Sequence, residues 1–61
     1  MTFDNLPQDP VILLSVVNTK LRDYYPTLDA LCDDMNVNKN DIVAKLAGIG
    51  YTYDSALNKF V

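Results

Sequence analysis

Residues 28–49, LDALCDDMNVNKNDIVAKLAGI, decide the fold because their apolar positions form two helical sets with a short break between them. The first set, at spacing i, i+3, i+4 and i+7, is Leu28, Leu31, Cys32 and Met35, and the second is Ile42, Leu46 and Ile49. Only a tight turn fits in the break, and we expect Val37 within it to point inward. This spacing predicts a helix-turn-helix, a geometry that serves DNA reading as well as plain protein packing.

The polar residues around these two helices fit their expected ends. Thr27 is a suitable N-cap for the first helix, because its hydroxyl can accept a free backbone N–H of the first turn. Asn36 tolerates the left-handed conformation that closes a helix, and Asn38 can cap the next one. Gly48 or Gly50 is expected to end that helix.

A longer helix is predicted upstream of this stretch. Asp9 followed by Pro10 is a strong start signal, since the carboxylate accepts first-turn N–H groups and proline is tolerated at the first helical position. The helix should run to about Tyr24, because Pro26 disfavours helical backbone at the residue before it. The eight residues before this helix form an arm, and Phe3 and Leu6 are expected to anchor it on the core.

The helix is apolar on more than one side. Its predicted core face consists of Leu13, Leu14, Val17, Leu21 and Tyr24. Ile12 and Val16 lie outside that face, so the arm, the C-terminal segment or a second subunit should cover them. These two residues are the feature of the sequence that points to self-association.

A polar stripe on the same helix is the best candidate for specific polar recognition. It combines Ser15, Asn18 and Arg22, and the planar Arg22 guanidinium suits a carboxylate or a phosphate. The simpler interpretation is an ordinary exposed face with Arg22 paired to a nearby aspartate. Tyr24 and Tyr53 are expected in the core, whereas Tyr25 is expected to be exposed. The predicted partner-binding set is Ile12, Val16, Ser15, Asn18, Arg22 and Tyr25.

After Gly50 the period of the sequence changes from a helical one to two. Tyr51 and Tyr53 alternate with polar residues, which predicts a strand with one buried face. Asp54 suits the first position of a turn and Asn58 tolerates a positive φ, so residues 51–61 are predicted to form a hairpin. Such a hairpin is marginal alone and must lie on the helices.

Length and composition predict a single small domain over residues 1–61, divided into the arm (1–8), three helices (9–50) and the hairpin (51–61). At this size a core holds a chain folded with little surplus stability. The longest apolar run is far shorter than the ~20 residues of a membrane helix, and the N-terminal residues lack the basic start of a signal peptide. One cysteine allows no internal disulfide, so we expect a cytoplasmic protein.

DNA binding is the alternative that the helix-turn-helix suggests. The third helix would read the major groove, and the candidate contacts are Asn38, Lys39, Asn40, Val43, Ala44 and, on the hairpin, Lys59. Affinity for DNA comes mainly from the attraction between basic side chains and the phosphates. Five basic residues against eight aspartates, with a net charge of −3, therefore disfavour this alternative.

The sequence provides little chemistry for catalysis or metal binding. It contains no histidine, which removes the common general base, and one cysteine cannot build a zinc site. The alternating oxygen side chains that begin at Asp34 resemble the start of a calcium loop, but Lys39 replaces its glycine and Lys45 its final glutamate. Cys32 is expected to be a small buried residue. We therefore predict no catalytic residue, no metal site, no cofactor and no enzyme activity.

Nearly the whole chain, from about Leu6 to Phe60, resembles a family of very short bacterial proteins catalogued as a domain of unknown function. The resemblance rests on DP at residues 9–10, NTKLRD at 18–23, LCDD at 31–34, GY at 50–51 and YD at 53–54. It implies a compact bacterial protein whose helix-turn-helix core is similar to a reduced winged helix. It implies no activity.

Together these patterns predict a mainly α fold, a three-helix bundle with a helix-turn-helix and a short C-terminal β-hairpin. The expected function is that of a non-catalytic interaction module that binds another protein or itself. The alternative is a DNA-binding accessory protein or regulator that uses the third helix.

Overall fold

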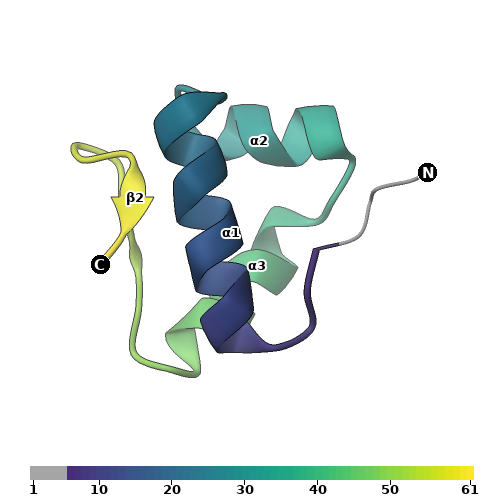
Figure 1. The fold of residues 1–61 in the computed structure, drawn as a ribbon, viewed down its shortest axis with the longest axis vertical. Helices are drawn as coiled ribbons and strands as arrows, with labels where there is room; N and C mark the ends of the chain where they lie inside the picture. The colour runs from purple at the N-terminus through teal and green to yellow at the C-terminus, as the bar shows by residue number, and fades with distance from the viewer. Residues whose placement is uncertain (1–5) are drawn as a thin grey trace.

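The computed structural model describes residues 6–61, which form three helices followed by a two-stranded antiparallel hairpin (Figure 1). The elements are α1 (Pro10–Asp23), α2 (Leu28–Met35), α3 (Lys39–Ala47), β1 (Tyr53–Asp54) and β2 (Lys59–Phe60). The predicted mainly α fold with a C-terminal hairpin is confirmed. The predicted anchor Phe3 lies outside the described residues, and Leu6 packs against the core as expected.

The helices begin and end where the polar residues predict. The side chains of Asp9, Thr27 and Asn38 each accept a backbone N–H of the following first turn at 2.8–3.0 Å. Asn36 closes α2 in the left-handed conformation, with φ 56°. These contacts satisfy backbone groups that helix ends otherwise leave without partners.

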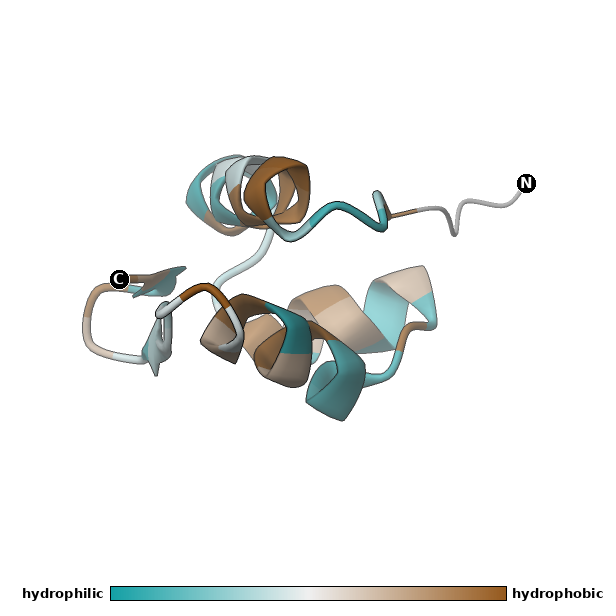
Figure 2. Cartoon of the chain, turned by 90° about the horizontal axis from the view of Figure 1, so that it is seen from below, coloured by the Kyte–Doolittle hydropathy of each residue, from teal (hydrophilic) through white to brown (hydrophobic). Residues whose placement is uncertain are grey.

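The core lies where α1 crosses the layer formed by α2 and α3, with the hairpin beside it (Figure 2). The buried side chains are Leu13, Val17 and Leu21 from α1, Leu28, Leu31 and Cys32 from α2, Ile42 and Leu46 from α3, and Phe60 from β2. Val37, in the turn between α2 and α3, is half-buried against them. The residues predicted as two helical sets therefore face a common core.

Two neighbouring tyrosines exchange the roles predicted for them. Tyr24 was expected in the core but is 72% exposed, whereas Tyr25 was expected to be exposed but is half-buried against the core. The reason is that α1 ends at Asp23. Tyr24 has already left helical geometry, with φ −124°, so the helical phase that assigned it to the core no longer applies. The chain turns there and brings Tyr25 inward.

The hairpin has a turn that its own side chains stabilise. The Asp54 carboxylate accepts the backbone N–H groups of Ala56 and Leu57 at 2.9 and 3.2 Å, as its turn-forming role predicts. Asn58 adopts a φ of 54°, also as predicted. Hydrogen bonds in both directions between Thr52 and Val61, each 2.9 Å, extend the pairing of the two strands.

Side-chain hydrogen bonds fasten this hairpin to the helices. The Asn58 amide nitrogen donates to the carbonyls of Leu21 and Tyr25 at 3.1 and 2.9 Å. The Tyr53 hydroxyl donates to the Asn58 Oδ1 at 2.7 Å and accepts the N–H of Leu28 at 3.2 Å. A hairpin that would be marginal alone is thus joined to the end of α1 and the start of α2.

None of the helices within residues 6–61 combines the length and the apolar character that crossing a membrane requires.

Candidate functional site

The solvent-facing side of α1 carries the apolar residues that the sequence identifies as uncovered. Ile12 is 54% exposed and Val11 next to it is 64% exposed, whereas Val16 is only half-buried. Ser15, which lies between Ile12 and Val16 in the sequence, is exposed. Val11 was not among the predicted site residues, although its place one residue before Ile12 in the first turn indicates the same surface. The result is a small apolar surface at the start of α1. The ribbon of this part of α1 is brown in Figure 2 because its residues are hydrophobic.

Asn18 is a structural residue rather than a free recognition group. Its amide nitrogen donates to the Phe60 carbonyl at 3.2 Å, and its Oδ1 accepts the Phe60 N–H at 2.8 Å. Both ends of the amide are therefore used within the fold. The role of Asn18 in a partner-binding stripe stays a prediction, and the structure shows that a contact with β2, distant in sequence, occupies its side chain.

Arg22 pairs with its neighbour in the sequence. Its Nε and Nη2 donate to the two carboxylate oxygens of Asp23 at 2.8 and 2.9 Å. This hydrogen-bonded pair raises the pKa of Arg22 and holds the pKa of Asp23 below its ordinary value. The simpler interpretation, in which Arg22 meets a nearby aspartate, is confirmed. The Arg22 side chain is nevertheless 73% exposed, so it remains within reach of a partner.

Tyr25 also has an internal partner. Its hydroxyl donates to the Asp34 carboxylate at 2.6 Å, and this bond to an anion raises the pKa of Tyr25. The contact ties the segment after α1 to the last turn of α2. Of the predicted partner-binding residues, Ile12, Ser15 and Arg22 are thus exposed, while Val16, Asn18 and Tyr25 are half-buried.

The residues predicted to contact DNA are only partly available. The Asn38 side chain caps α3, and Val43 is half-buried against the core. Lys39 forms an ion pair with Asp29 of α2, with a distance of 2.9 Å from Nζ to Oδ1, and this pair raises the pKa of Lys39. Asn40 and Ala44 are exposed on α3, and Lys59 is exposed on β2.

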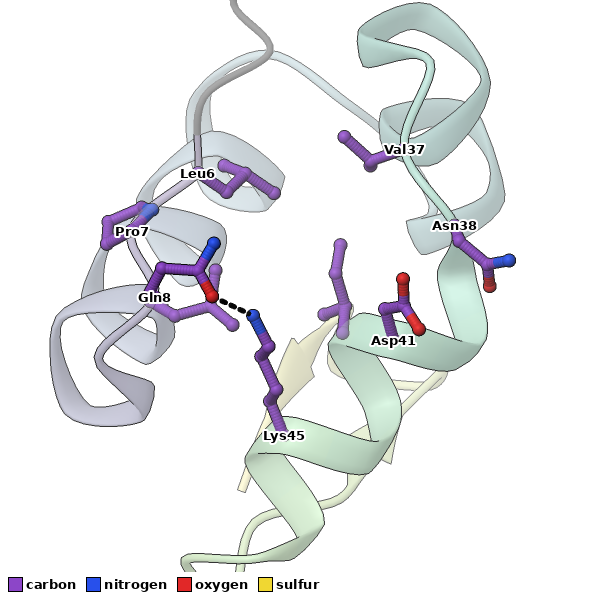
Figure 3. Close-up of a pocket in the computed structure, with 9 residues that line it drawn as sticks. Leu6, Pro7, Gln8, Val37, Asn38, Asp41 and Lys45 are labelled. Atoms are coloured by element: carbon purple, nitrogen blue, oxygen red, sulfur yellow. Dashed lines mark hydrogen bonds between the residues drawn. The ribbon is translucent and has the colours of Figure 1, made fainter.

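A small cavity separates the arm from α3, with Leu6 and Val37 on opposite sides and Gln8 and Lys45 joined across it (Figure 3). The Lys45 Nζ donates to the Gln8 Oε1 at 2.8 Å. Leu13 and Ile42 supply further apolar lining, and the volume is about 240 Å³. This lies below the ~300–1,000 Å³ of most ligand sites.

A larger, open groove lies between α1 and the hairpin. Its volume is about 560 Å³, and its lining consists of Asn18, Thr19, Leu21, Arg22, Leu57, Asn58 and Lys59. The sequence patterns do not connect these residues, and Thr19 and Leu57 were not among the predicted site residues. No local pattern could have found the groove, because its two walls are far apart along the chain and meet only through the packing of the hairpin.

Reactive and metal-binding groups are sparse in the described part of the chain. Within residues 6–61 no cluster of three or more acidic, cysteine or histidine side chains could hold a metal ion. Cys32 is a buried free thiol, and burial together with the nearby Asp29 carboxylate raises its pKa. A thiol in this environment is a poor nucleophile at neutral pH.

Residues 7–60 match the family model of the domain of unknown function DUF4250. The chain belongs to this family. The match covers both walls of the groove and the exposed side of α1, so both surfaces lie within the family domain. Comparisons with curated proteins and with solved structures gave no match. Because the family carries no stated activity, a function has to be argued from the surface of the domain itself.

Proposed function

We propose that this member of the DUF4250 family is a non-catalytic interaction module that binds a second copy of itself, or another protein, through the exposed side of α1. The observation that carries the proposal is the pair Val11 and Ile12, which are adjacent and 64% and 54% exposed. Two neighbouring branched apolar side chains with that exposure leave apolar surface in water, and burial against a partner would remove it.

The charge distribution favours a second copy as the partner. Residues 11–19 contain no charged side chain, although the chain as a whole has a net charge of −3. Two copies of an acidic protein repel each other wherever acidic surfaces meet. An uncharged helix face allows them to approach, and a two-fold arrangement would place the same face on both sides.

The proposed interface is small. The 14 residues of α1 span roughly 21 Å at the usual helical rise. One face of such a helix covers much less than the ~800 Å² per partner of a standard interface. We therefore expect weak association, which becomes visible only at high protein concentration.

Sedimentation equilibrium between about 10 μM and about 1 mM tests the proposal, because that range covers weak dissociation constants. The average mass should rise with concentration for the wild-type chain but not for Ile12→Arg. Leu57→Arg is the matched control, since Leu57 is 59% exposed and lies on the hairpin. A wild-type chain that stays monomeric throughout refutes self-association, and equal loss of association in both variants refutes the role of α1.

DNA binding through α3 has weaker support. Lys39 is already paired with Asp29, and the Asn38 side chain is committed to its cap. A titration with mixed-sequence duplex at low salt separates the two hypotheses. Amide shifts confined to residues 38–44 and Lys59, and abolished by added salt, would favour DNA.

As part of the same proposal we place the protein in the cytoplasm, because a lone buried thiol suits a reducing compartment.

A further inference from the structure

We propose that the groove between α1 and the hairpin binds a short acidic segment of a partner protein, with an apolar side chain beside its carboxylates. The inference shares with the proposed function only the premise that the protein is a binding module. It concerns a different surface, which consists of Thr19 and Arg22 on α1 and Leu57 and Lys59 on the hairpin.

The groove carries cations in an otherwise acidic protein. Its ionisable lining residues are Arg22, which is paired with Asp23 outside the lining, and Lys59, whereas the net charge of the chain is −3. An acidic ligand would be repelled by much of the remaining surface and attracted here. Charge complementarity therefore favours a negatively charged occupant.

Most other cations of the protein are already engaged. The Lys20 ammonium lies over the Tyr24 ring, 5.7 Å from its centroid, Lys39 pairs with Asp29, and Lys45 binds Gln8. Within residues 6–61, by contrast, Lys59 has neither an ion pair nor a side-chain hydrogen bond. Its charge is available to a ligand.

Arg22 retains donors for a second carboxylate. Asp23 takes the N–H groups of Nε and Nη2, and in the described structure Nη1 has no acceptor. A guanidinium can bind more than one acceptor because its N–H groups fan out in a plane. A ligand carboxylate can therefore bind without displacing Asp23.

Leu57 supplies the apolar part of the site, and the fold holds it in place. It is 59% exposed, its backbone N–H is fixed by Asp54, and the next residue is Asn58, whose side chain forms three hydrogen bonds. A leucine held outward on a rigid turn loses little conformational freedom when it binds. It would pack against an apolar side chain of the ligand.

An acidic peptide fits this surface better than a nucleic acid does. Affinity for a phosphate backbone grows with the number of cations that neutralise it, and this groove offers only Arg22 and Lys59. A peptide can combine carboxylates with an apolar side chain placed on Leu57.

The test is an NMR titration of the full-length, ¹⁵N-labelled chain with an acetylated, amidated peptide of alternating glutamate and leucine. The charge-reversed peptide of lysine and leucine is the control ligand. Amide shifts should be confined to Thr19, Arg22 and residues 57–59, and salt should weaken binding. Lys59→Gln should weaken binding about threefold, in the range of one exposed ion pair. Lys20→Gln makes the same change in charge outside the groove and should leave the affinity unchanged.

Leu57→Ser should weaken binding by about fivefold or more, because the apolar contact is lost. Ile12→Arg should bind the peptide normally, which separates this inference from the proposed role of the other α1 face. Binding of an acidic peptide in the groove would be overturned by shifts outside the groove, equal binding of the charge-reversed peptide, equal loss in Lys20→Gln, or tighter binding of a short DNA duplex. Shifts in the groove that appear on raising the protein concentration alone would assign it to a second copy and overturn the partner assignment.

Discussion

The side-chain amide of Asn18 and the backbone of Phe60 exchange two hydrogen bonds, of 3.2 and 2.8 Å. Through this amide, α1 takes the place of a third strand beside β2. In the hairpin, the paired backbone groups belong to Thr52 and Val61, and Phe60 therefore directs its N–H and C=O away from β1. An unpaired strand edge is a template for aggregation. Asn18 blocks this one and fixes the buried Phe60 ring at the same time.

Asn18→Ala should lower the free energy of unfolding by about 1–3 kcal/mol, because two half-buried backbone groups of Phe60 lose their partners. Urea denaturation measures this loss. The amides of residues 59–61 should also exchange faster with solvent. Asn40→Ala is the control, since Asn40 is exposed on α3, and it should change stability by less than about 0.5 kcal/mol. Equal effects of the two substitutions would contradict the role given to Asn18.

Asn58 and Asn36 have nearly the same backbone conformation, with φ 54° and 56°, but different side-chain surroundings. Asn58→Gly keeps the conformation and removes three hydrogen bonds, so it should cost about 2 kcal/mol or more. Asn36→Gly should be close to neutral, because glycine suits the end of α2. Asn58→Ala should cost roughly 1 kcal/mol more than Asn58→Gly, the price of a left-handed residue with a Cβ. Thermal unfolding of the three variants measures these differences. If Asn36→Gly were the most destabilising, the role given to the Asn58 side chain would be wrong.

Tyr53→Phe isolates the hydroxyl that joins the hairpin to α2. The ring stays beside Phe60, at 5.5 Å between centroids, while the bonds to Leu28 and Asn58 disappear. We expect a loss of about 1–2 kcal/mol by chemical denaturation. Tyr51→Phe, at an exposed tyrosine, should have no measurable effect. A neutral Tyr53→Phe would show that ring packing alone holds the hairpin.

The Cys32 thiol should react slowly with iodoacetamide in the native protein, because burial and the Asp29 carboxylate raise its pKa. The folded state then keeps its proton at a pH where the unfolded thiol has lost it. Stability should therefore be unaffected below the ordinary thiol pKa of 9.0 and should fall as the pH rises above it. Urea midpoints of wild type and Cys32→Ala between pH 7 and pH 10 measure this. The fall in stability with rising pH should be smaller in the variant, because it lacks the thiol. Fast alkylation at neutral pH would contradict the buried environment.

Much of the fold follows from short-range patterns. The caps Asp9, Thr27 and Asn38, and the turn residues Asp54 and Asn58, act on groups within three positions along the chain, or on their own backbone conformation. The apolar spacing in residues 28–49 likewise needs only the helical repeat to place its side chains on one face. Family membership, over residues 7–60, is also a property of the sequence.

The tertiary structure alone decided which polar residues remain free to bind. Asn18 and Phe60 are 42 residues apart, and Lys45 and Gln8 are 37 apart, so no periodicity relates them. The exchange of Tyr24 and Tyr25 has a similar cause, because helical phase ends where α1 ends, and Tyr25 then packs against the core and binds Asp34 of α2. The sequence by itself determined where the helices and the hairpin form, since each depends on neighbouring backbone groups. The groove and the exposed face of α1 arise only when those elements pack, because distance in space, rather than distance along the chain, decides which side chains meet.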